Sequence, residues 1–282
     1  MVKILAHIRI MRPLNLTISA LTIMMIAHAL GAIGDAALIV SAIMVVLSYN
    51  AAANVLNDYM DQETDALNRP DRPLSKGEVK PKTALIMALL LFAIGTACAF
   101  MLSFEAKLVA IGIALPLLIL YSLRLKKLPL VGNIVVALML ALTFLFAGFV
   151  FNNVEKVLVP AALAFGLTLV RELVKDIADM DGDKAASMRT FPIAAGMRLA
   201  VSLSVFLAMI TGLGALLPYR FGLYGEIYLL ILVFGVEIPM MTSVVLLVKN
   251  PAISTAVKSA QILKFSTIAG LLALYFGMLY AV

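Results

Sequence analysis

The chain has little charge, one cysteine and two histidines. Asp, Glu, Lys and Arg make up 13% of its 282 residues, whereas 63% are hydrophobic and the mean hydropathy is +1.07. This composition excludes an ordinary soluble globular domain. The single Cys98 excludes an internal disulfide, and His7 and His28 are too far apart in the chain to predict a histidine metal site or a catalytic pair. The sequence also lacks a glycine-rich phosphate loop and a nucleophile elbow.

Long apolar segments recur along the whole chain, and each approaches the length that spans a bilayer. They lie at roughly 14–31, 37–56, 83–102, 108–121, 131–151, 157–173, 194–217, 224–248 and 262–281. In lipid every backbone polar group needs an internal partner, so these segments predict helices. No linker or low-complexity tract separates them. The sequence therefore predicts an all-α, polytopic membrane protein with nine transmembrane helices, folded as one domain over residues 1–282.

The basic residues indicate the orientation in the membrane. Of the 22 Lys and Arg residues, 19 lie in the N-terminal segment and in four loops. These loops are residues 57–82, 122–130, 171–198 and 249–264. By the positive-inside rule the N-terminus and these loops are cytoplasmic. The expected location is the cytoplasmic membrane, with the lipid bilayer as partner; the net charge of +6 does not require nucleic acid, and no protein partner is indicated.

The acidic residues gather in two of the basic loops. Six of the sixteen Asp and Glu residues lie in 58–78 and five lie in 172–183. Each cluster has polar residues spaced by four, three and four positions. These are Asn54, Asp58, Asp61 and Asp65 in the first cluster and Glu172, Asp176, Asp179 and Asp183 in the second. Such spacing predicts one acidic stripe on a helix in each cluster. Wet loops explain isolated acids, but two matched stripes of repelling charges favour a bound divalent cation.

Magnesium suits this arrangement because it prefers one or two carboxylates together with waters and substrate phosphates. Two stripes that each hold one Mg²⁺ would grip a diphosphate between them. Basic residues predicted on the same side of the membrane would add positive charge. They are Arg69, Arg72, Lys126, Lys127, Lys175 and Lys184. Because the apolar helices would accept a hydrocarbon tail, the sequence favours a lipid diphosphate as substrate.

Four motifs resemble those of the UbiA superfamily of intramembrane prenyltransferases. "NDYMDQETD", which begins at Asn57, resembles the NDxxDxxxD motif of that superfamily, and "DIADMDGD", which begins at Asp176, resembles its second acidic motif. "YSLRLKK", with Tyr121 and Lys126, is similar to a short Tyr/Lys segment after the fourth helix. "RPLN", which begins at Arg12, is similar to an N-terminal RPxN signature. The resemblance covers essentially the whole chain in helix number and motif order.

The resemblance implies a nine-helix bundle around a central cavity open to the membrane, and Mg²⁺-dependent transfer of a prenyl group from a prenyl diphosphate. The implied metal residues are Asn57, Asp58, Asp61, Asp65, Asp176, Asp179 and Asp183, although Asp58 could instead orient basic side chains. The basic residues named above would contact the diphosphate, together with Arg12, Asn15 and Asn54. Asp61 and Asp65 are the candidate catalytic acids, with Asp65 as proton acceptor, and Tyr121 could face an allylic cation.

The acceptor is indicated by two longer stretches. "LNRPDRPLSKG" and "KDIADMDGDKAASMRTFP" resemble forms found in archaeal ether-lipid members of the superfamily, with departures at Lys76 and Phe191. They favour transfer of a geranylgeranyl group from geranylgeranyl diphosphate to the free hydroxyl of geranylgeranylglyceryl phosphate. Prenylation of an aromatic quinone precursor or of a tetrapyrrole is the alternative. An ion-coupled transporter is the alternative from another class. Such a carrier needs an acid near the middle of a span, and only Glu237, near Pro239, fits that description.

Overall fold

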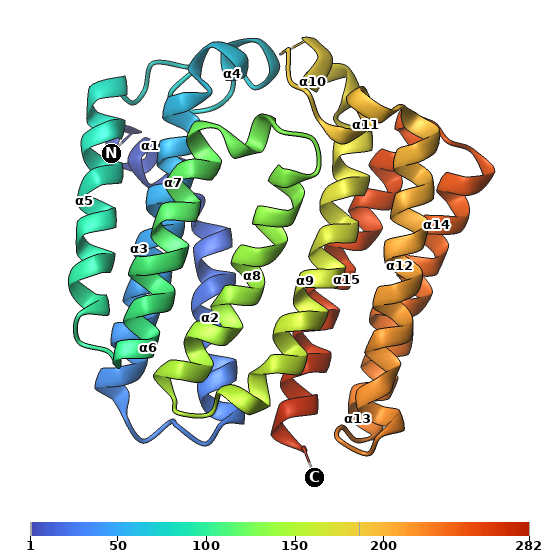
Figure 1. Cartoon of the computed structure of the whole chain (residues 1–282). Helices are drawn as coiled ribbons and strands as arrows, with labels where there is room; N and C mark the ends of the chain where they lie inside the picture. Colours follow the sequence, from blue (N-terminus) through green and yellow to red (C-terminus); the bar gives the residue numbers. More distant parts are fainter. Residues whose placement is uncertain (1, 186, 282) are drawn as a thin grey trace. The chain divides into compact units, whose positions relative to one another are not determined.

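The computed structural model describes residues 2–185 and 187–281, apart from the side chains of residues 2–4, 64, 67 and 68. All regular secondary structure in this described part is helical (Figure 1). Within residues 2–185 and 187–281, eight helices are long and apolar enough to cross a membrane. They are α3 (Ala36–Met60), α5 (Pro81–Ala99), α6–η1–α7 (Phe104–Leu123), α8 (Val131–Val150), α9 (Val154–Ala178), α12 (Met197–Arg220), α13–η3–α14 (Glu226–Lys249) and α15 (Ile253–Leu279). The prediction of an all-α, multi-pass membrane fold is confirmed.

The first predicted span corresponds to α2 (Pro13–Ala29), an apolar helix of 17 residues. This length is below that of the other eight, so the count of nine spans stays a prediction. The remaining elements of the described chain are short. They are α1 (Val2–Ile10), α4 (Gln62–Asn68), η2 (Leu125–Lys127), α10 (Met180–Ala185) and α11 (Phe191–Ala195).

Two of the long helices contain a π-helical turn before a proline. In the first, α6 (Phe104–Lys107) leads through η1 (Leu108–Ala114) to α7 (Leu115–Leu123). In the second, α13 (Glu226–Leu232) leads through η3 (Val233–Glu237) to α14 (Ile238–Lys249). Each π turn has a glycine four residues before the proline, Gly112 with Pro116 and Gly235 with Pro239. Proline has no N–H, so the carbonyl four residues earlier loses its helical donor. The two spans are therefore interrupted in the same way at matching positions of their sequences.

The contacts divide the chain into two compact units, Met1–Leu125 with Phe146–Asn152, and Lys126–Leu145 with Asn153–Val282. In the first unit, α3 packs against α2, α5 and α7. Small buried residues of α3, among them Ala42 and Ala52, allow the neighbouring helices to approach closely. The prediction of one domain over the whole chain, and that of a central cavity, stay predictions.

In the second unit, α9 packs against α12 and α15, and α15 also packs against α13 and α14. Two serines join α14 to α15: the Ser259 hydroxyl donates to the carbonyl of Ser243 at 3.2 Å, and the Ser243 hydroxyl lies 3.5 Å from the carbonyl of Ser259. Because hydrocarbon offers no competing water, such small polar side chains are suited to hold membrane helices together.

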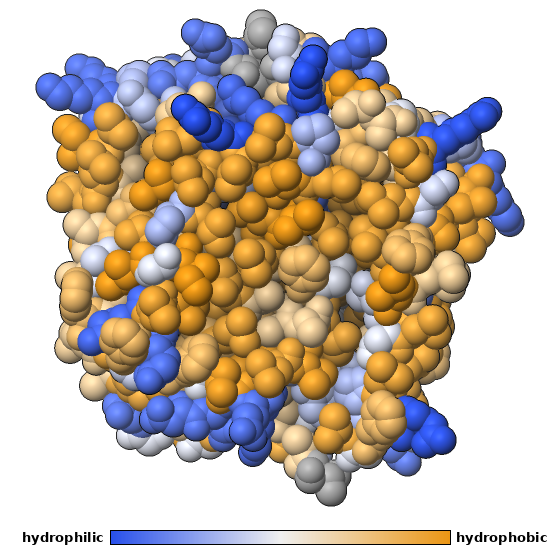
Figure 2. Space-filling view, viewed as in Figure 1, coloured by the Kyte–Doolittle hydropathy of each residue, from blue (hydrophilic) through white to orange (hydrophobic). Residues whose placement is uncertain are grey.

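Large apolar side chains remain on the outside of the helices. Phe100 is 67% exposed, Phe234 69% and Phe265 73%. Apolar residues also cover most of the face seen in Figure 2. Soluble proteins rarely expose apolar surface on this scale, so these faces are suited to contact lipid.

Candidate functional site

Each acidic stripe is interrupted at its third member. The helix α3 ends before Asp61, which has φ −102° and ψ 14°, and Asp65 lies on the separate helix α4. In the same way α9 ends before Asp179, with φ −93° and ψ 4°, and Asp183 lies on α10. The expectation of one continuous helical stripe is therefore wrong at this point. Spacing alone could not show that the backbone bends after each long helix.

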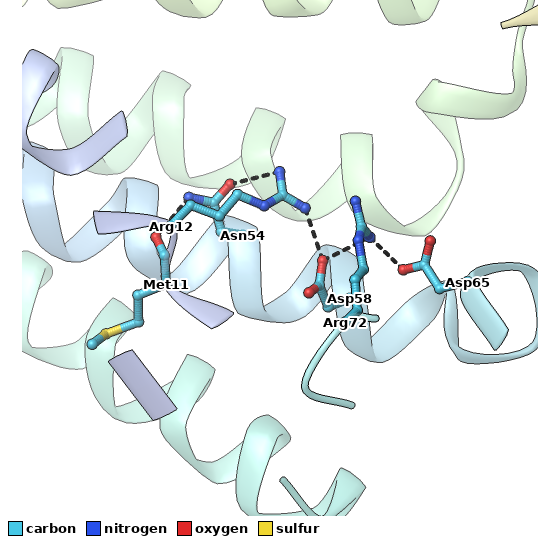
Figure 3. A network of polar contacts seen from close by, with 6 residues as sticks. All are labelled: Met11, Arg12, Asn54, Asp58, Asp65 and Arg72. Atoms are coloured by element: carbon cyan, nitrogen blue, oxygen red, sulfur yellow. Dashed lines mark hydrogen bonds and ion pairs between the residues drawn. The ribbon is translucent and has the colours of Figure 1, made fainter. Parts of the chain in front are cut away.

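The first cluster contains an ion-pair network in the first unit (Figure 3). Arg12 donates from Nη2 to Asp58 Oδ1 at 2.8 Å and from Nη1 to Asn54 Oδ1 at 3.2 Å. Arg72 donates from Nη1 to the same Asp58 oxygen at 2.9 Å and also pairs with Asp65. Five residues predicted for the site are thus brought together, and two guanidinium groups balance two carboxylates.

Arg12 adopts a backbone conformation that arginine rarely uses. It precedes α2 with φ 59° and ψ 69°, in the left-handed region. This conformation costs an L residue about 1–2 kcal/mol. Its side-chain bonds hold it there, and Asn54 Nδ2 also donates to the carbonyl of Met11 at 3.0 Å. The start of α2 is therefore fixed to α3 at the first acidic cluster.

Asp65 is buried, with 6% of its surface exposed. Burial raises the pKa of its carboxyl above the usual value, although the charge of Arg72 and its hydrogen bond act in the opposite direction. A raised pKa makes a carboxylate a better proton acceptor than an ordinary aspartate. The environment of Asp65 is therefore compatible with the predicted role of proton acceptor.

Asn57 provides an oxygen that is suited to a metal ion. Its Oδ1 is buried and has no hydrogen-bond partner among the described residues. A buried polar atom without a partner is costly, and an amide oxygen is a ligand that Mg²⁺ accepts. Asp61 follows one turn later and is half-buried. Within the described residues, no group of three or more His, Cys, Asp or Glu side chains is placed so that it could hold a metal ion.

In the second unit, Asp176 lies in the last turn of α9 and accepts a hydrogen bond of 2.8 Å on Oδ2 from Asn133 Nδ2. Asn133 lies near the start of α8 and is 6% exposed. Sequence reasoning did not identify Asn133. The available signal was a carboxamide within a long apolar segment, where a polar side chain needs a partner.

Other predicted residues of the second cluster lie close to Asp176 in the chain. The buried Glu172 pairs with Arg171 and with Lys175, both at 3.0 Å, so it neutralises basic charge within its own helix. Asp179 and Asp183 are half-buried. The two acidic clusters belong to different units.

The remaining predicted site residues differ in exposure. Three of them are exposed on short helices or loops: Arg69, Lys127 and Lys184. Asn15 is exposed on α2, whereas Tyr121 on α7 and Lys126 are half-buried. The structure gives Arg69 no side-chain partner among the residues that it describes.

Glu237, the acid considered for a transporter, lies at the end of the π turn η3. One of its carboxylate oxygens, Oε1, is buried and has no hydrogen-bond partner in the described part of the chain. The other oxygen, Oε2, lies against Gly212 of α12. A Cβ built on Gly212 would be 2.6 Å from this oxygen. Gly212 therefore makes room for the carboxyl group between the two helices.

Comparisons with known proteins identify the family of this chain. The model of the UbiA prenyltransferase family matches residues 16–268. Digeranylgeranylglyceryl phosphate synthase of Methanothermobacter thermautotrophicus is 33% identical over 92% of this chain and 90% of its own length. The protein of the same name from Methanospirillum hungatei is 37% identical over 95% of each chain.

Solved structures have the same fold. A structure of digeranylgeranylglyceryl phosphate synthase in membranes matches with a TM-score of 0.83 and 28% identity over 99% of both chains. A UbiA homologue from Archaeoglobus fulgidus, bound to DMAPP and Mg²⁺, matches with a TM-score of 0.70 and 19% identity over 95% of this chain and 98% of its own. The family model and the relatives extend over most of the sequence, and both acidic motifs lie within that range. The chain therefore belongs to the UbiA prenyltransferase family.

Proposed function

We propose that this chain is a Mg²⁺-dependent prenyltransferase that joins a geranylgeranyl group to geranylgeranylglyceryl phosphate. The observation that carries the proposal is the agreement among relatives. Proteins from eight archaea, 31–37% identical to this chain over 81–97% of its length, all bear the name digeranylgeranylglyceryl phosphate synthase. The "LNRPDRPLSKG" stretch, which resembles the archaeal ether-lipid form, supports the same acceptor.

Each of the two acidic clusters would hold metal ligands. The proposed oxygen ligands include the buried amide oxygen of Asn57 and the carboxylates of the two motifs. These carboxylates are Asp61 and Asp65 in the first motif and Asp176, Asp179 and Asp183 in the second. The exposed side chains of Arg69, Lys127 and Lys184, together with Lys126 and Lys175, would add positive charge for the diphosphate.

The reaction requires a C–O bond to break and another to form. Bound Mg²⁺ would supply charge stabilisation for the departing diphosphate. The basic side chains assist by binding the phosphate oxygens, and the apolar helices hold the tail away from water, which would otherwise capture the allylic cation. Tyr121 would face that cation through its ring. The acceptor hydroxyl oxygen then bonds to C1, its proton passes to Asp65, and inorganic pyrophosphate is the second product.

We place the active site on the cytoplasmic side of the cell membrane because the basic loops carry both acidic clusters. The test uses the exposed Lys76. A Lys76→Cys variant in a Cys98→Ser background is labelled with a membrane-impermeant maleimide in sealed vesicles of known orientation. Labelling in inside-out vesicles alone supports the assignment, and labelling in right-side-out vesicles alone contradicts it.

The acceptor is tested by comparing three candidate acceptors. Purified protein with Mg²⁺ and labelled geranylgeranyl diphosphate is offered geranylgeranylglyceryl phosphate, 4-hydroxybenzoate and chlorophyllide in parallel reactions. We expect label to enter the ether lipid and to depend on the metal. Preference for either ring acceptor would overturn the acceptor assignment, and movement of label across the membrane without product would favour a transporter.

A further inference from the structure

Two arginines converge on one oxygen of Asp58. Arg12 Nη2 lies 2.8 Å and Arg72 Nη1 lies 2.9 Å from Asp58 Oδ1, and this aspartate is 3% exposed (Figure 3). Arg72 Nη1 also bonds to Asp65. The four groups carry two positive and two negative charges, so the cluster is neutral as it stands. We call these four residues, Arg12, Asp58, Arg72 and Asp65, the arginine strap.

The strap ties together parts of the first unit that are separate in sequence. Arg12 immediately precedes α2, Asp58 lies in the last turns of α3, and Arg72 lies in the segment between α4 and α5. The partners of Asp58 are 46 and 14 positions away. Without Asp58, the guanidinium groups of Arg12 and Arg72 would lose the acceptor that they share. The start of α2 and the segment between α4 and α5 would then no longer be joined through α3.

The segment that Arg72 anchors is ordered by its own contacts as well. Residues 69–80 contain a turn in which Lys76 N–H donates to the carbonyl of Arg72 at 2.9 Å and Glu78 N–H to that of Pro73 at 2.9 Å. Val79 is 1% exposed, and Glu78 pairs with Arg9 at 3.4 Å. The strap therefore holds a folded segment in place, and that segment carries Arg69 at its start.

We propose that Asp58 is a positioning residue and not a metal ligand. Its Oδ1 already accepts two charged N–H groups, and two guanidinium charges within 3 Å of one oxygen would repel a divalent cation approaching it. Asp58 acts through Arg12 and Arg72: it keeps the segment of residues 69–80 against α3 and keeps Asp65 facing Arg72. Asn57 and Asp61, on either side of it in the motif, take the metal role. The effect expected on the KM rests on the proposed function. The effect expected on the order of residues 69–80 does not depend on it.

The structural consequence is tested by proteolysis. Trypsin does not cut efficiently before proline, and Lys76 is the one basic residue in 69–81 that proline does not follow. In Asp58→Asn, which keeps the size of the side chain but removes its charge, cleavage after Lys76 should be at least tenfold faster than in the native protein. Glu63→Gln, an exposed acid on α4, is the matched control and should stay within twofold. An unchanged rate in Asp58→Asn would overturn the strap.

The functional consequence is tested by kinetics. Asp58→Asn should raise the KM for geranylgeranyl diphosphate about tenfold while kcat changes less than threefold and the Mg²⁺ midpoint stays within twofold. Asp61→Asn should shift the Mg²⁺ midpoint instead. In an Arg72→Gln background, Asp58→Asn should add less than threefold to KM because one of its two partners is already gone. A Mg²⁺ midpoint displaced as far by Asp58→Asn as by Asp61→Asn would show that Asp58 is a metal ligand.

The two tests separate the inference from the proposed function. If the native protein forms no ether product, the function fails while the proteolysis still decides the strap. If Asp58→Asn does not fold, Arg72→Gln serves in its place, because it keeps the bond between Arg12 and Asp58 yet releases the same segment. Faster cleavage after Lys76 in that variant supports the strap, and an unchanged rate contradicts it.

Discussion

The carboxamide of Asn133 donates a hydrogen bond of 2.8 Å to Oδ2 of Asp176. The two residues lie on consecutive helices, α8 and α9, and Asn133 is 6% exposed. This bond fixes the direction of one carboxylate oxygen of Asp176. Because both oxygens belong to one rigid group, the orientation of the other oxygen is fixed as well. An amide that orients a metal-binding carboxylate typically contributes strongly to affinity or activity although it touches neither metal nor substrate.

Asn133→Ala should therefore lower kcat/KM by about 10- to 100-fold, which corresponds to the loss of about 1.5–3 kcal/mol for a hydrogen bond to a charged group. The measurement is turnover of labelled geranylgeranyl diphosphate at saturating Mg²⁺. Asn250→Ala, at the exposed end of α14, is the control and should leave kcat/KM unchanged. Equal activity in the two variants would show that Asn133 serves packing alone.

Asp61 and Asp179 occupy the same place in the two clusters, at the end of a long helix and before a short one. Replacing either with alanine removes a proposed metal ligand and should reduce turnover at least 100-fold, because the departing charge is no longer stabilised. Thermal unfolding in detergent should be little changed, since both side chains are only half-buried. The exposed Asp181→Ala is the matched control on α10, and activity near normal in both test variants would refute the metal roles.

The membrane fold could be predicted because apolar length and composition are sufficient to identify a spanning helix. The predicted segments 131–151 and 157–173, for example, correspond to α8 and α9. The π turns could not be predicted in this way, because apolar composition is the same in an α and a π turn. Proline at 116 and 239 is compatible with a kink in each helix but does not specify a π turn.

The acids of the candidate site could be identified from their spacing, but their hydrogen-bond partners could not. The spacing of Asp58, Asp61 and Asp65 is local in sequence, and it carries the motif. The pairing of Asp58 with Arg12 depends on how α2 packs against α3, over a separation of 46 positions. No periodicity encodes a contact of that kind. The same holds for Asn133, which is identified only when α8 lies beside α9.

The two arginines of "NRPDRPL" should respond differently to substitution. Arg69 is exposed, whereas Arg72 is bonded to two buried carboxylates. Arg69→Gln should raise the KM for geranylgeranyl diphosphate several-fold and leave the melting temperature within about 1 °C. Arg72→Gln should lower the melting temperature as well, since it leaves buried charge with fewer partners, a loss of about 1–3 kcal/mol. The KM and the melting temperature of both variants are measured in the same detergent. Equal changes in the two variants would contradict the separate roles of Arg69 and Arg72.

Gly95 on α5 lies against the ring of Tyr49 on α3. A Cβ at this position would be 2.6 Å from two ring carbons and 3.1 Å from Cβ of Ser48. The ring has little freedom to move, because Tyr49 is 4% exposed, its hydroxyl is hydrogen-bonded to Thr96 at 2.9 Å, and it contacts Phe92 edge to face.

Gly95→Ala should therefore destabilise the protein by about 1–3 kcal/mol, the usual cost of adding a methyl group to a core that cannot adjust. Gly214→Ala is the matched control, since Gly214 is also within a spanning helix but has nothing within 4 Å of a built Cβ. That control should be neutral or slightly stabilising, because alanine favours a helix over glycine by about 1 kcal/mol. Thermal unfolding in detergent measures both variants. If Gly95→Ala melts at the temperature of Gly214→Ala, the close contact between α3 and α5 does not limit stability.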